Sequence, residues 1–291
     1  MDKRISARIA LVAATLIWGT SFVILKNTLD SIPTLYVLAF RFSGAALLMF
    51  LVGIRRLSDA DRSGYINGGL VLGVLLFAAY TLQTYGLVYT TPGKNAFLTS
   101  SYCIMVPFLH WAINGKKPDG RNISAAFICV IGMALVSLRD DFSAGLGELL
   151  TIGCGLFYGL HIIATAKYIA NRNLALLSAA QFTVVALLSW ASALVSGPFP
   201  ADIPASAWSA VLYLCVMCTA VCFFLQAYGQ RYTPESSVAV IMTLESVFGT
   251  LISLLFYNER LTARTLTGFA LIFAAVLISE TRPQGTEIQR S

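Results

Sequence analysis

Charge is scarce in this chain of 291 residues, because Asp, Glu, Lys and Arg together make up 12% of it. An ordinary soluble domain contains about 25% charged residues. With 57% hydrophobic residues, the chain has too little polar surface for a soluble enzyme and too much apolar surface for a disordered segment. The composition predicts an integral membrane protein and makes the position of each remaining charge informative.

Signals for several kinds of chemistry are also missing. The six cysteines show no pairing in exposed loops, and Cys215 and Cys218 stand in an apolar stretch, where small residues serve helix packing. With two histidines and no glycine-rich nucleotide loop, the chain predicts no enzyme, no cofactor and no metal site. Its net charge of +6 is dispersed through short loops, so we expect no nucleic-acid partner.

Ten apolar stretches follow one another, each close to the roughly 20 residues that a transmembrane helix needs. Breakers such as Pro33, Pro92 and Pro198 separate them, and no polar domain lies between. The first stretch is too long, and too polar at Trp18 and Thr20, for a cleaved signal peptide. The expected spans cover residues 9–26, 34–54, 67–88, 95–113, 123–138, 147–170, 174–196, 208–230, 236–257 and 266–279.

Positive charge is distributed unevenly between the two sides that these spans define. With the N-terminus inside, fourteen of the twenty Lys and Arg residues fall on the inner side, five fall on the outer side, and Arg41 lies within a span. Loops on the cytoplasmic side carry the excess of Lys and Arg in membrane proteins. We therefore expect a multi-pass protein of a bacterial-type inner membrane with both termini in the cytoplasm.

The two halves of the chain repeat each other. Residues 82–86 (LQTYG) recur as 225–229 (LQAYG) at an offset of 143, while matches of the earlier spans have an offset of 140. A three-residue insertion between the seventh and eighth spans reconciles the two offsets. The matches at 140 pair Trp18-Gly19 with Tyr158-Gly159, Arg41-Phe42 with Gln181-Phe182, and 46–48 with 186–188.

This repeat sets the expected fold class and mechanism. Each repeat, 5–140 and 145–281, holds five spans, so the second enters the membrane in the opposite orientation to the first. We expect one all-α membrane domain over residues 1–291, with ten transmembrane helices in two inverted five-helix repeats. Such repeats are typical of secondary transporters, whose substrate sites lie near the midplane. The alternative is a duplication retained only for packing.

Several stretches also carry a family likeness when they are taken in order. They are 16–22 (LIWGTSF), Arg41-Phe42, 90–100 (TTPGKNAFLTS), Val106-Pro107, 244–248 (LESVF) and 257–262 (YNERLT). On these stretches the chain resembles the drug/metabolite transporter superfamily, specifically its ten-helix EamA-type permeases. It departs from the family at Ser246, where Pro is frequent, and at Asn258, where Gly is frequent. The resemblance implies movement of small metabolites without ATP hydrolysis, commonly the export of amino acids or related compounds.

Two charges are left well inside the predicted spans, Arg41 in the second and Glu245 in the ninth. A charge at the centre of a membrane helix costs about 2.5–3.5 kcal/mol on insertion scales, so it normally faces a cavity or a counter-ion. Arg41 is a candidate for binding an anionic substrate group, and the alternative is a structural arginine. Glu245 is a candidate for exchanging a proton or attracting a substrate amine, and the alternative is a buried carboxyl satisfied by neighbouring hydroxyls. We hypothesise that the two residues pair across the halves.

Polar side chains at helical spacing, clearest over residues 151–165, predict faces directed into the bundle, because lipid would leave these groups unpaired. Gln83 and Gln226 are symmetry mates, either as gates and ligand donors or as structural clamps. For single hydroxyl groups the alternative is a structural hydrogen bond. The candidate residues for substrate binding and transport are Trp18, Arg41, Tyr80, Gln83, Asn95, Thr99, Tyr102, Tyr158, His161, Gln181, Gln226 and Glu245.

The expected function is that of a secondary active transporter that exports small metabolites, such as amino acids or related amphipathic compounds, by alternating access. Proton coupling through Glu245 is a hypothesis. The expected partners are a small-molecule substrate, membrane lipid and protons, and one chain suffices because it contains both halves. The alternatives are a passive facilitator or channel for small solutes and an intramembrane lipid-modifying enzyme.

Overall fold

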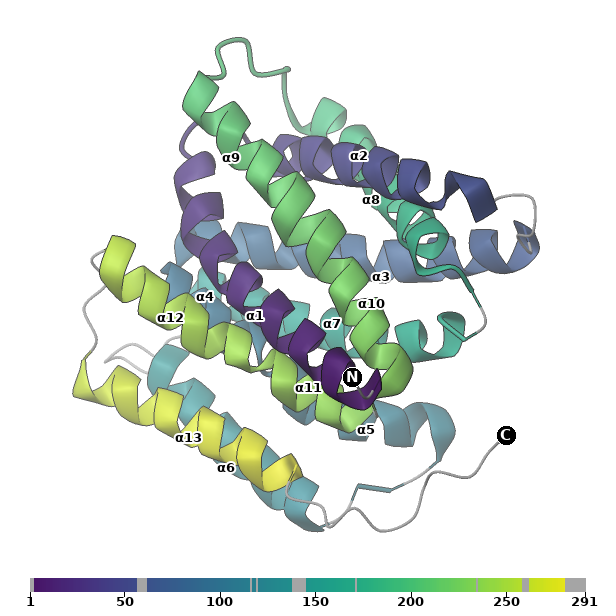
Figure 1. Cartoon of the computed structure of the whole chain (residues 1–291). Helices are drawn as coiled ribbons and strands as arrows, with labels where there is room; N and C mark the ends of the chain where they lie inside the picture. Colours follow the sequence, from purple (N-terminus) through teal and green to yellow (C-terminus); the bar gives the residue numbers. More distant parts are fainter. Residues whose placement is uncertain are drawn as a thin grey trace.

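The computed structural model describes residues 3–56, 62–115, 117–118, 120–137, 145–170, 172–233, 235–257 and 262–280. Within these residues every regular element is helical (Figure 1). The helices are α1 (Lys3–Thr28), α2 (Thr34–Gly53), α3 (Arg62–Tyr89), α4 (Pro92–Thr99), α5 (Tyr102–Asn114), α6 (Gly120–Ser137), α7 (Leu146–Tyr168), α8 (Leu174–Ser196), α9 (Ala205–Cys215), α10 (Cys222–Tyr232), α11 (Glu235–Met242), α12 (Leu244–Phe256) and α13 (Ala263–Glu280).

Helix length and composition support membrane insertion. In the part of the chain that the structure describes, seven helical segments are long and apolar enough to cross a membrane, and three shorter apolar helices accompany them. At a rise of 1.5 Å per residue, about 20 residues cover the roughly 30 Å of hydrocarbon. Each of the ten expected spans overlaps a helical segment, with boundaries that differ by up to six residues. The end of the fifth span, residue 138, lies outside the described residues.

Three of the expected continuous spans are interrupted. The fourth breaks at Ser100 and Ser101, the ninth breaks at Thr243, and the eighth contains a π-helical turn over Val216–Val221. At the two breaks, hydroxyl groups take carbonyls of the preceding turn, since Ser100 Oγ donates to Ala96 O (3.3 Å) and Ser246 Oγ to Thr243 O (2.6 Å). Such side-chain bonds compete with the helical ladder. Apolar periodicity does not report them, so the sequence predicted unbroken helices.

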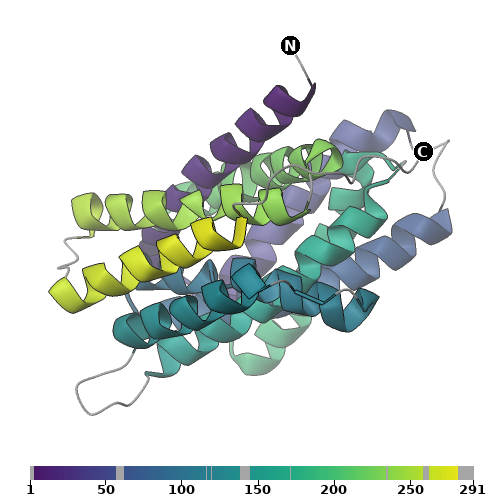
Figure 2. The same cartoon turned by 90° about the horizontal axis from the view of Figure 1, so that it is seen from below.

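The helices pack in an arrangement that places α1 and α7 at the centre. α1 contacts α10 and α12, whereas α7 contacts α3 and α5. α2 packs along α8 at one edge of the bundle, and α6 along α13 at the opposite edge, where Figures 1 and 2 both show the latter pair side by side. The broken helices lie against each other, with α4 on α12 and α5 on α11.

Small residues allow the closest of these crossings. The G-x-x-x-G spacing of Gly69 and Gly73 predicts a close helix crossing. Both glycines face α8, which confirms this prediction. A Cβ atom added to Gly73 would lie 2.5 Å from Val184 Cβ and 2.8 Å from Gln181 O. Contacts of this length exclude any side chain at Gly73 unless the two helices move apart.

We expect Gly73→Ala to destabilise the protein by about 1–3 kcal/mol, the usual cost of forcing an extra carbon into a packed interior. Gly153→Ala is the matched control, because its added Cβ would meet only Leu82 Cδ1, at an ordinary 3.7 Å. In the control, alanine's better helix propensity leaves stability equal or higher. Thermal unfolding in detergent micelles measures both variants, and equal melting temperatures would contradict this account of the α3–α8 crossing.

Candidate functional site

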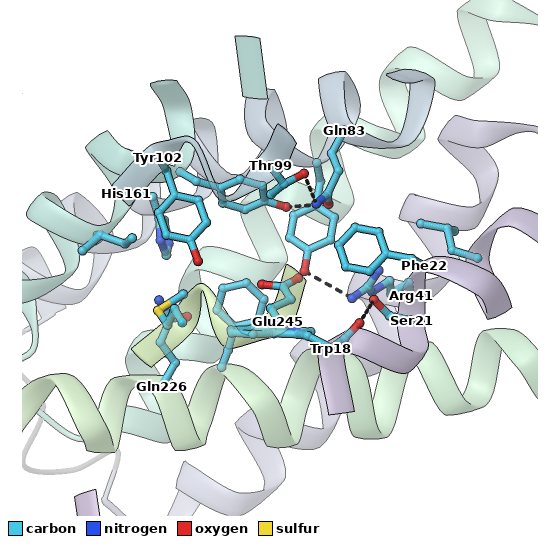
Figure 3. Close-up of a pocket in the computed structure, with 16 residues that line it drawn as sticks. Trp18, Ser21, Phe22, Arg41, Gln83, Thr99, Tyr102, His161, Gln226 and Glu245 are labelled. Atoms are coloured by element: carbon cyan, nitrogen blue, oxygen red, sulfur yellow. Dashed lines mark hydrogen bonds between the residues drawn. The ribbon is translucent and has the colours of Figure 1, made fainter. Parts of the chain in front are cut away.

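A cavity lies in the middle of the bundle, at the level of the two breaks that separate α4 from α5 and α11 from α12. α1, α2, α3, α7 and α10 form its walls, and the residues on either side of the two breaks complete it. Figure 3 shows these side chains converging from helices far apart in the sequence. Of the twelve candidate residues, ten line the cavity: Trp18, Arg41, Tyr80, Gln83, Thr99, Tyr102, Tyr158, His161, Gln226 and Glu245.

The cavity is narrow. Its volume is about 30 Å³, and a single water needs about 10–15 Å³. Room for about two waters is too little for an amino acid or any compound of similar size. A metabolite therefore enters only if the surrounding helices move apart.

Arg41 is held by the π-helical turn. Its Nε donates to Thr219 Oγ1 (2.5 Å), and its Nη2 donates to Cys218 O (3.1 Å) and to Tyr80 Oη (3.2 Å). The guanidinium also lies 4.7 Å from the centre of the Tyr80 ring, a cation–π contact. Cys218 O accepts a second bond from Trp18 Nε1 (2.7 Å). One carbonyl of the π-helical turn, that of Cys218, therefore positions both Trp18 and Arg41.

Glu245 lies in the first turn of α12, directly after the break at Thr243. The side chain is 8% exposed, and in Figure 3 it lies in the centre of the cavity, between Arg41 and Gln226. Among the described residues it has no hydrogen bond or ion pair, so the hypothesised direct pair with Arg41 is not formed. The N-terminus of α12 favours its negative charge, and its oxygens remain available to a ligand or a proton.

A polar network fixes the opposite wall. Gln83 Oε1 accepts from Tyr158 Oη (2.8 Å), and Gln83 Nε2 donates to Thr99 Oγ1 (3.2 Å). Asn95 lies one layer further out, where its Nδ2 donates to Gln83 O (3.2 Å) and to Thr151 Oγ1 (2.7 Å). Asn95 is thus fully buried behind the lining and orients Gln83 and α7, without lining the cavity itself.

Gln181 likewise stands behind the lining, in contrast to its repeat mate Arg41. Its Oε1 lies 2.9 Å from His161 Nε2, and His161 Nδ1 lies 3.5 Å from Thr165 Oγ1. His161 is 2% exposed. Gln181 and Thr165 therefore hold the imidazole of His161 at the cavity wall. Gln181 itself does not line the cavity, because it lies behind His161.

Two lining groups contrast with these satisfied ones. Tyr102 Oη is buried without a hydrogen-bond partner in the described structure, and Figure 3 shows it directed into the cavity. Gln226, 3% exposed, also forms no hydrogen bond among the described residues, whereas its repeat mate Gln83 is fully engaged. Tyr102, Gln226 and Glu245 thus present free polar atoms on one side of the cavity.

Six residues of the lining were not among the candidates: Ser21, Phe22, Leu25, Ile162, Phe223 and Met242. The ring of Phe223 contacts Trp18 (5.3 Å between ring centres) and Tyr80 (6.1 Å) and so closes the aromatic wall. The repeat offers a signal for three of them, because an offset of 140 relates Ser21 to His161, and an offset of 143 takes Tyr80 to Phe223 and Thr99 to Met242. Leu25 and Ile162 carry no polarity that would mark them in an apolar helix.

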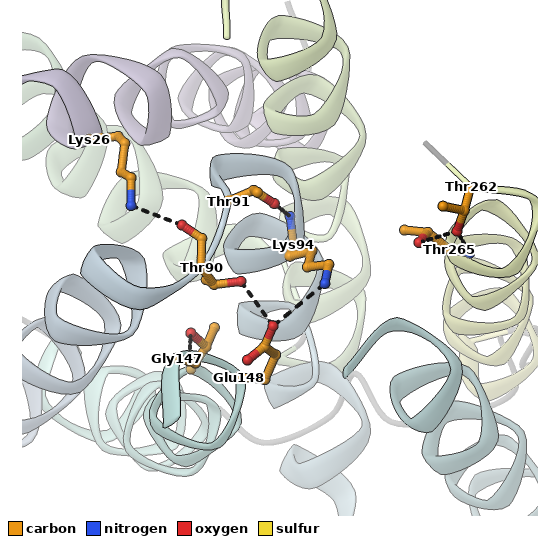
Figure 4. A network of polar contacts seen from close by, with 9 residues as sticks. Lys26, Thr90, Thr91, Lys94, Gly147, Glu148, Thr262 and Thr265 are labelled. Carbon is orange, nitrogen blue, oxygen red and sulfur yellow. Dashed lines mark hydrogen bonds and ion pairs between the residues drawn. The ribbon is translucent and has the colours of Figure 1, made fainter. Parts of the chain in front are cut away.

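A second polar network closes the bundle at the C-terminal end of α3 (Figure 4). Lys26 Nζ donates to three carbonyls there, those of Leu87 (2.6 Å), Val88 (2.9 Å) and Thr90 (3.0 Å). Thr90 Oγ1 donates to Glu148 Oε1 (3.2 Å), and Lys94 Nζ lies 3.6 Å from the same oxygen. This network ties together α1, α3, α4 and α7.

The other repeat has a related contact. Arg231, in the last turn of α10, donates to the carbonyls of Ile169 (2.8 Å) and Arg172, which follow the end of α7. Lys26 at the end of α1 and Arg231 at the end of α10 thus each bind carbonyls at the end of a neighbouring helix. If the helices at either end of the bundle move apart, the hydrogen bonds of Lys26 or Arg231 must break, or their side chains must move with the helices.

The cysteines of the apolar stretch serve the packing of the π-helical turn and of the start of α10 against α1. Cys218 Sγ contacts Ile17 O (3.8 Å) and Cys222 Sγ contacts Ala14 O (3.6 Å). All six cysteines are buried, and none of them forms a disulfide. Among the described residues, no group of three His, Cys, Asp or Glu side chains is placed to hold a metal ion.

Long apolar helices around a closed central cavity with two buried charges define a multi-pass membrane protein. Comparison with known proteins gives the family: the chain belongs to the EamA-like transporter family of the drug/metabolite transporter superfamily, whose model matches residues 5–138 and 145–281. It is 32% identical to an uncharacterized transporter of Archaeoglobus fulgidus over 286 residues, covering 96% of this chain and 87% of the relative. It is 20% identical to the uncharacterized transporter YoaV of Bacillus subtilis, covering 94% of this chain and 97% of YoaV.

The fold is also similar to that of a solved protein structure described only as a crystal structure, with a TM-score of 0.71. The match covers 94% of this chain and 96% of that one, at 15% sequence identity. Resemblance at this identity concerns the fold alone. It supports the helix arrangement around the cavity.

Proposed function

We propose that the protein is a secondary active transporter that exports small amphipathic metabolites, such as amino acids or related amines, by alternating access between two inverted five-helix repeats. The observation that carries this proposal is the composition of the cavity wall. Fourteen of its sixteen lining residues form seven pairs under the two sequence offsets of the repeat. A site built equally from two inverted repeats is typical of secondary transporters.

The pairs run through both groups of spans. At an offset of 140, Trp18, Ser21 and Phe22 correspond to Tyr158, His161 and Ile162, and at an offset of 143, Tyr80, Gln83, Thr99 and Tyr102 correspond to Phe223, Gln226, Met242 and Glu245. The remaining two lining residues are Leu25 and Arg41. The repeat symmetry thus determines the shape of the site, whereas the charges of Arg41 and Glu245 have no charged counterpart in the other repeat.

The helix contacts support the same pseudo-two-fold relation. The contacts of α1 with α10 and α12 correspond to the contacts of α7 with α3 and α5. Two helices also pack against their own equivalents in the other repeat, α2 against α8 and α6 against α13. Both ninth and fourth spans break beside the cavity. Two such repeats have similar energies when their conformations are exchanged, which provides outward-open and inward-open states. The closed cavity, with Lys26 and Arg231 binding carbonyls at helix ends, corresponds to a state between them.

The chemistry of the wall favours an amine-bearing substrate. Among the described lining residues, Glu245 is the charged group without a hydrogen bond or ion pair, whereas Arg41 makes three bonds within the protein. Trp18, Tyr80 and Phe223 present aromatic faces, which attract cations and stack on rings. An ammonium group and a proton would compete for Glu245, and this competition is the simplest form of exchange between substrate and protons.

Orientation and assembly belong to the same proposal. The excess of Lys and Arg in the inner loops supports an inner-membrane location with both termini in the cytoplasm, and ten spans follow if the three shorter apolar helices also cross. Repeats 5–140 and 145–281 within a single chain supply both sides of the cavity. A monomer is therefore sufficient for transport.

Counterflow in proteoliposomes tests the proposal directly. Vesicles are preloaded with excess unlabelled compound from a panel of amino acids, amines and nucleosides, and uptake of the labelled compound is followed over time. We expect transient accumulation for at least one amphipathic amine or amino acid, and none in protein-free vesicles. Equilibration without uphill accumulation under any ion gradient would assign a passive facilitator, and chemical conversion of a lipid would assign an enzyme.

A further inference from the structure

A second hollow lies on the outer surface of the bundle, between α2 and α3. α8 forms its floor with Leu176, Ala179, Ala180 and Thr183. The hollow has a volume of about 440 Å³, far larger than that of the central cavity. Figure 1 shows α2 and α3 running on either side of α8. We call this hollow the α2–α3 groove.

Packing of small residues produces the groove. Both flanking helices are drawn tightly onto α8, since an added Cβ would lie 2.8 Å from Leu176 at Gly53 and 2.7 Å from Ala180 at Gly69. Between these contacts, Ala46 on α2 is too short to reach α3. The rim is apolar, with Leu47 61% and Ile66 60% exposed, as expected of a surface that lipid covers.

One end of the groove is basic. Arg62, in the first turn of α3, lines it, and Arg55 and Arg56 are exposed on the 3₁₀ turn that follows α2. The connection also carries Asp59 and Asp61, which lie outside the described residues, so residues 55–62 have a net charge of +1.

The beginning of α8 adds to the positive potential at this end. Tyr65, another lining residue, accepts a bond from Asn173 N (2.7 Å) next to Arg172, and Arg231 donates to Arg172 O. The N-termini of α3 and α8 lie here as well and carry partial positive charge.

We propose that the α2–α3 groove binds one anionic phospholipid, with its phosphate at Arg62 and an acyl chain along the alanines of α8. Basic pockets between transmembrane helices are known to hold anionic head groups. The floor from Leu176 to Thr183 extends about 10 Å along α8 at 1.5 Å per residue, which fits within the roughly 15 Å of one leaflet. A site with a cation at the interface and an apolar slot below it matches this ligand at both ends.

The location gives such a lipid a consequence beyond solvation. α2 and α3 belong to the first family-matched segment and α8 to the second, so the acyl chain would bridge the two. A bound lipid therefore stabilises the packing of α2 and α3 on α8. The proposal requires membrane insertion but no particular transport substrate, so it stands or fails independently of the proposed function.

Native mass spectrometry of the purified full chain tests the site, with phosphatidylglycerol and phosphatidylcholine of identical acyl chains as probes. We expect one phosphatidylglycerol molecule to be retained in preference to phosphatidylcholine. Arg62→Ala should weaken its retention about fivefold, the effect of roughly one interfacial cation. Arg8→Ala, which removes an exposed arginine of α1 away from the groove, is the matched control and should leave retention unchanged.

A second variant separates the slot from the charge. Ala46→Phe fills the groove without altering a cation, and we expect it to abolish preferential retention while size-exclusion chromatography still shows a folded protein. Equal retention of both lipids by the unaltered protein, or equal losses for Arg62→Ala and Arg8→Ala, would overturn the proposal. If Ala46→Phe does not fold, the comparison of Arg62→Ala with Arg8→Ala decides it alone.

Discussion

Proteoliposomes containing the Glu245→Gln variant are expected to show no substrate accumulation in response to an imposed pH gradient. With one proton exchanged per neutral substrate, a gradient of about two pH units supports up to about 100-fold accumulation, because each unit corresponds to about 1.36 kcal/mol. Glutamine preserves the size of the side chain but can neither bind nor release a proton. The accumulation ratio should therefore fall to about one, while downhill flux persists.

The sign of the pH effect follows from competition at this carboxyl. In the unaltered protein, lowering the pH on the side from which substrate binds should weaken binding, because a proton then occupies Glu245 and removes its charge. In Glu245→Gln, binding should not change with pH over the same range. Substrate binding measured by scintillation proximity at several pH values would show the difference.

Glu148→Gln provides the matched control for this prediction. Glu148 is also buried, 8% exposed, but it lies at the start of α7 beside Lys94 and Thr90 and does not line the cavity. This variant should keep the full response to the pH gradient even if its stability declines. Accumulation that survives in Glu245→Gln, or that disappears equally in both variants, would show that Glu245 is not the coupling group.

The second large effect is expected from Arg41→Ala, which should lower both stability and transport. The substitution leaves Thr219 and Tyr80 without their charged partner and removes the cation nearest the centre of the cavity. Hydrogen bonds to charged groups contribute about 1.5–3 kcal/mol, so we expect unfolding in detergent to become easier by at least that amount. Transport should be lost as well, because the π-helical turn then no longer holds the α2 wall.

Arg41→Lys distinguishes geometry from charge. Lysine keeps the positive charge but lacks the planar fork that bonds Thr219 and Cys218 together, so we expect it to restore only part of the stability. The double variant Arg41→Ala with Glu245→Gln measures the coupling of the two charges, and its loss should be smaller than the sum of the single losses. Strict additivity would show that the two residues act independently, although they share one cavity.

Much of this arrangement was predictable from local patterns. Hydrophobic spacing located the helical segments because each must cover about 30 Å of hydrocarbon with apolar side chains. The repeat indicated Gln226 and Glu245 as partners of Gln83 and Tyr102, and all four line the cavity. The pair Gly69 and Gly73 was correctly predicted as a close crossing, because only glycine permits backbones to approach so closely.

Other features depend on contacts between distant segments. The sequence gives Asn95 and Gln181 the same polar character as the lining residues, yet both stand behind it, bonded to Gln83 and His161. Arg41 was hypothesised to pair with Glu245, but its acceptors are Thr219, Tyr80 and the Cys218 carbonyl in the π-helical turn. No local pattern reports which carbonyl of another helix will accept a hydrogen bond from a given side chain.

The sequence by itself determined that this chain is a helical membrane protein, that its halves repeat and that Arg41 and Glu245 are its buried charges of interest. These properties follow from composition and spacing, because lipid tolerates neither unpaired backbone nor solitary charge. Only the tertiary structure decided that Gln83 is engaged while Gln226 is free, that both broken helices meet at one cavity, and that a basic groove lies between α2 and α3. Those outcomes depend on which side chains meet across helix interfaces. Because the interior is close-packed, each of these contacts depends on the arrangement of all the helices.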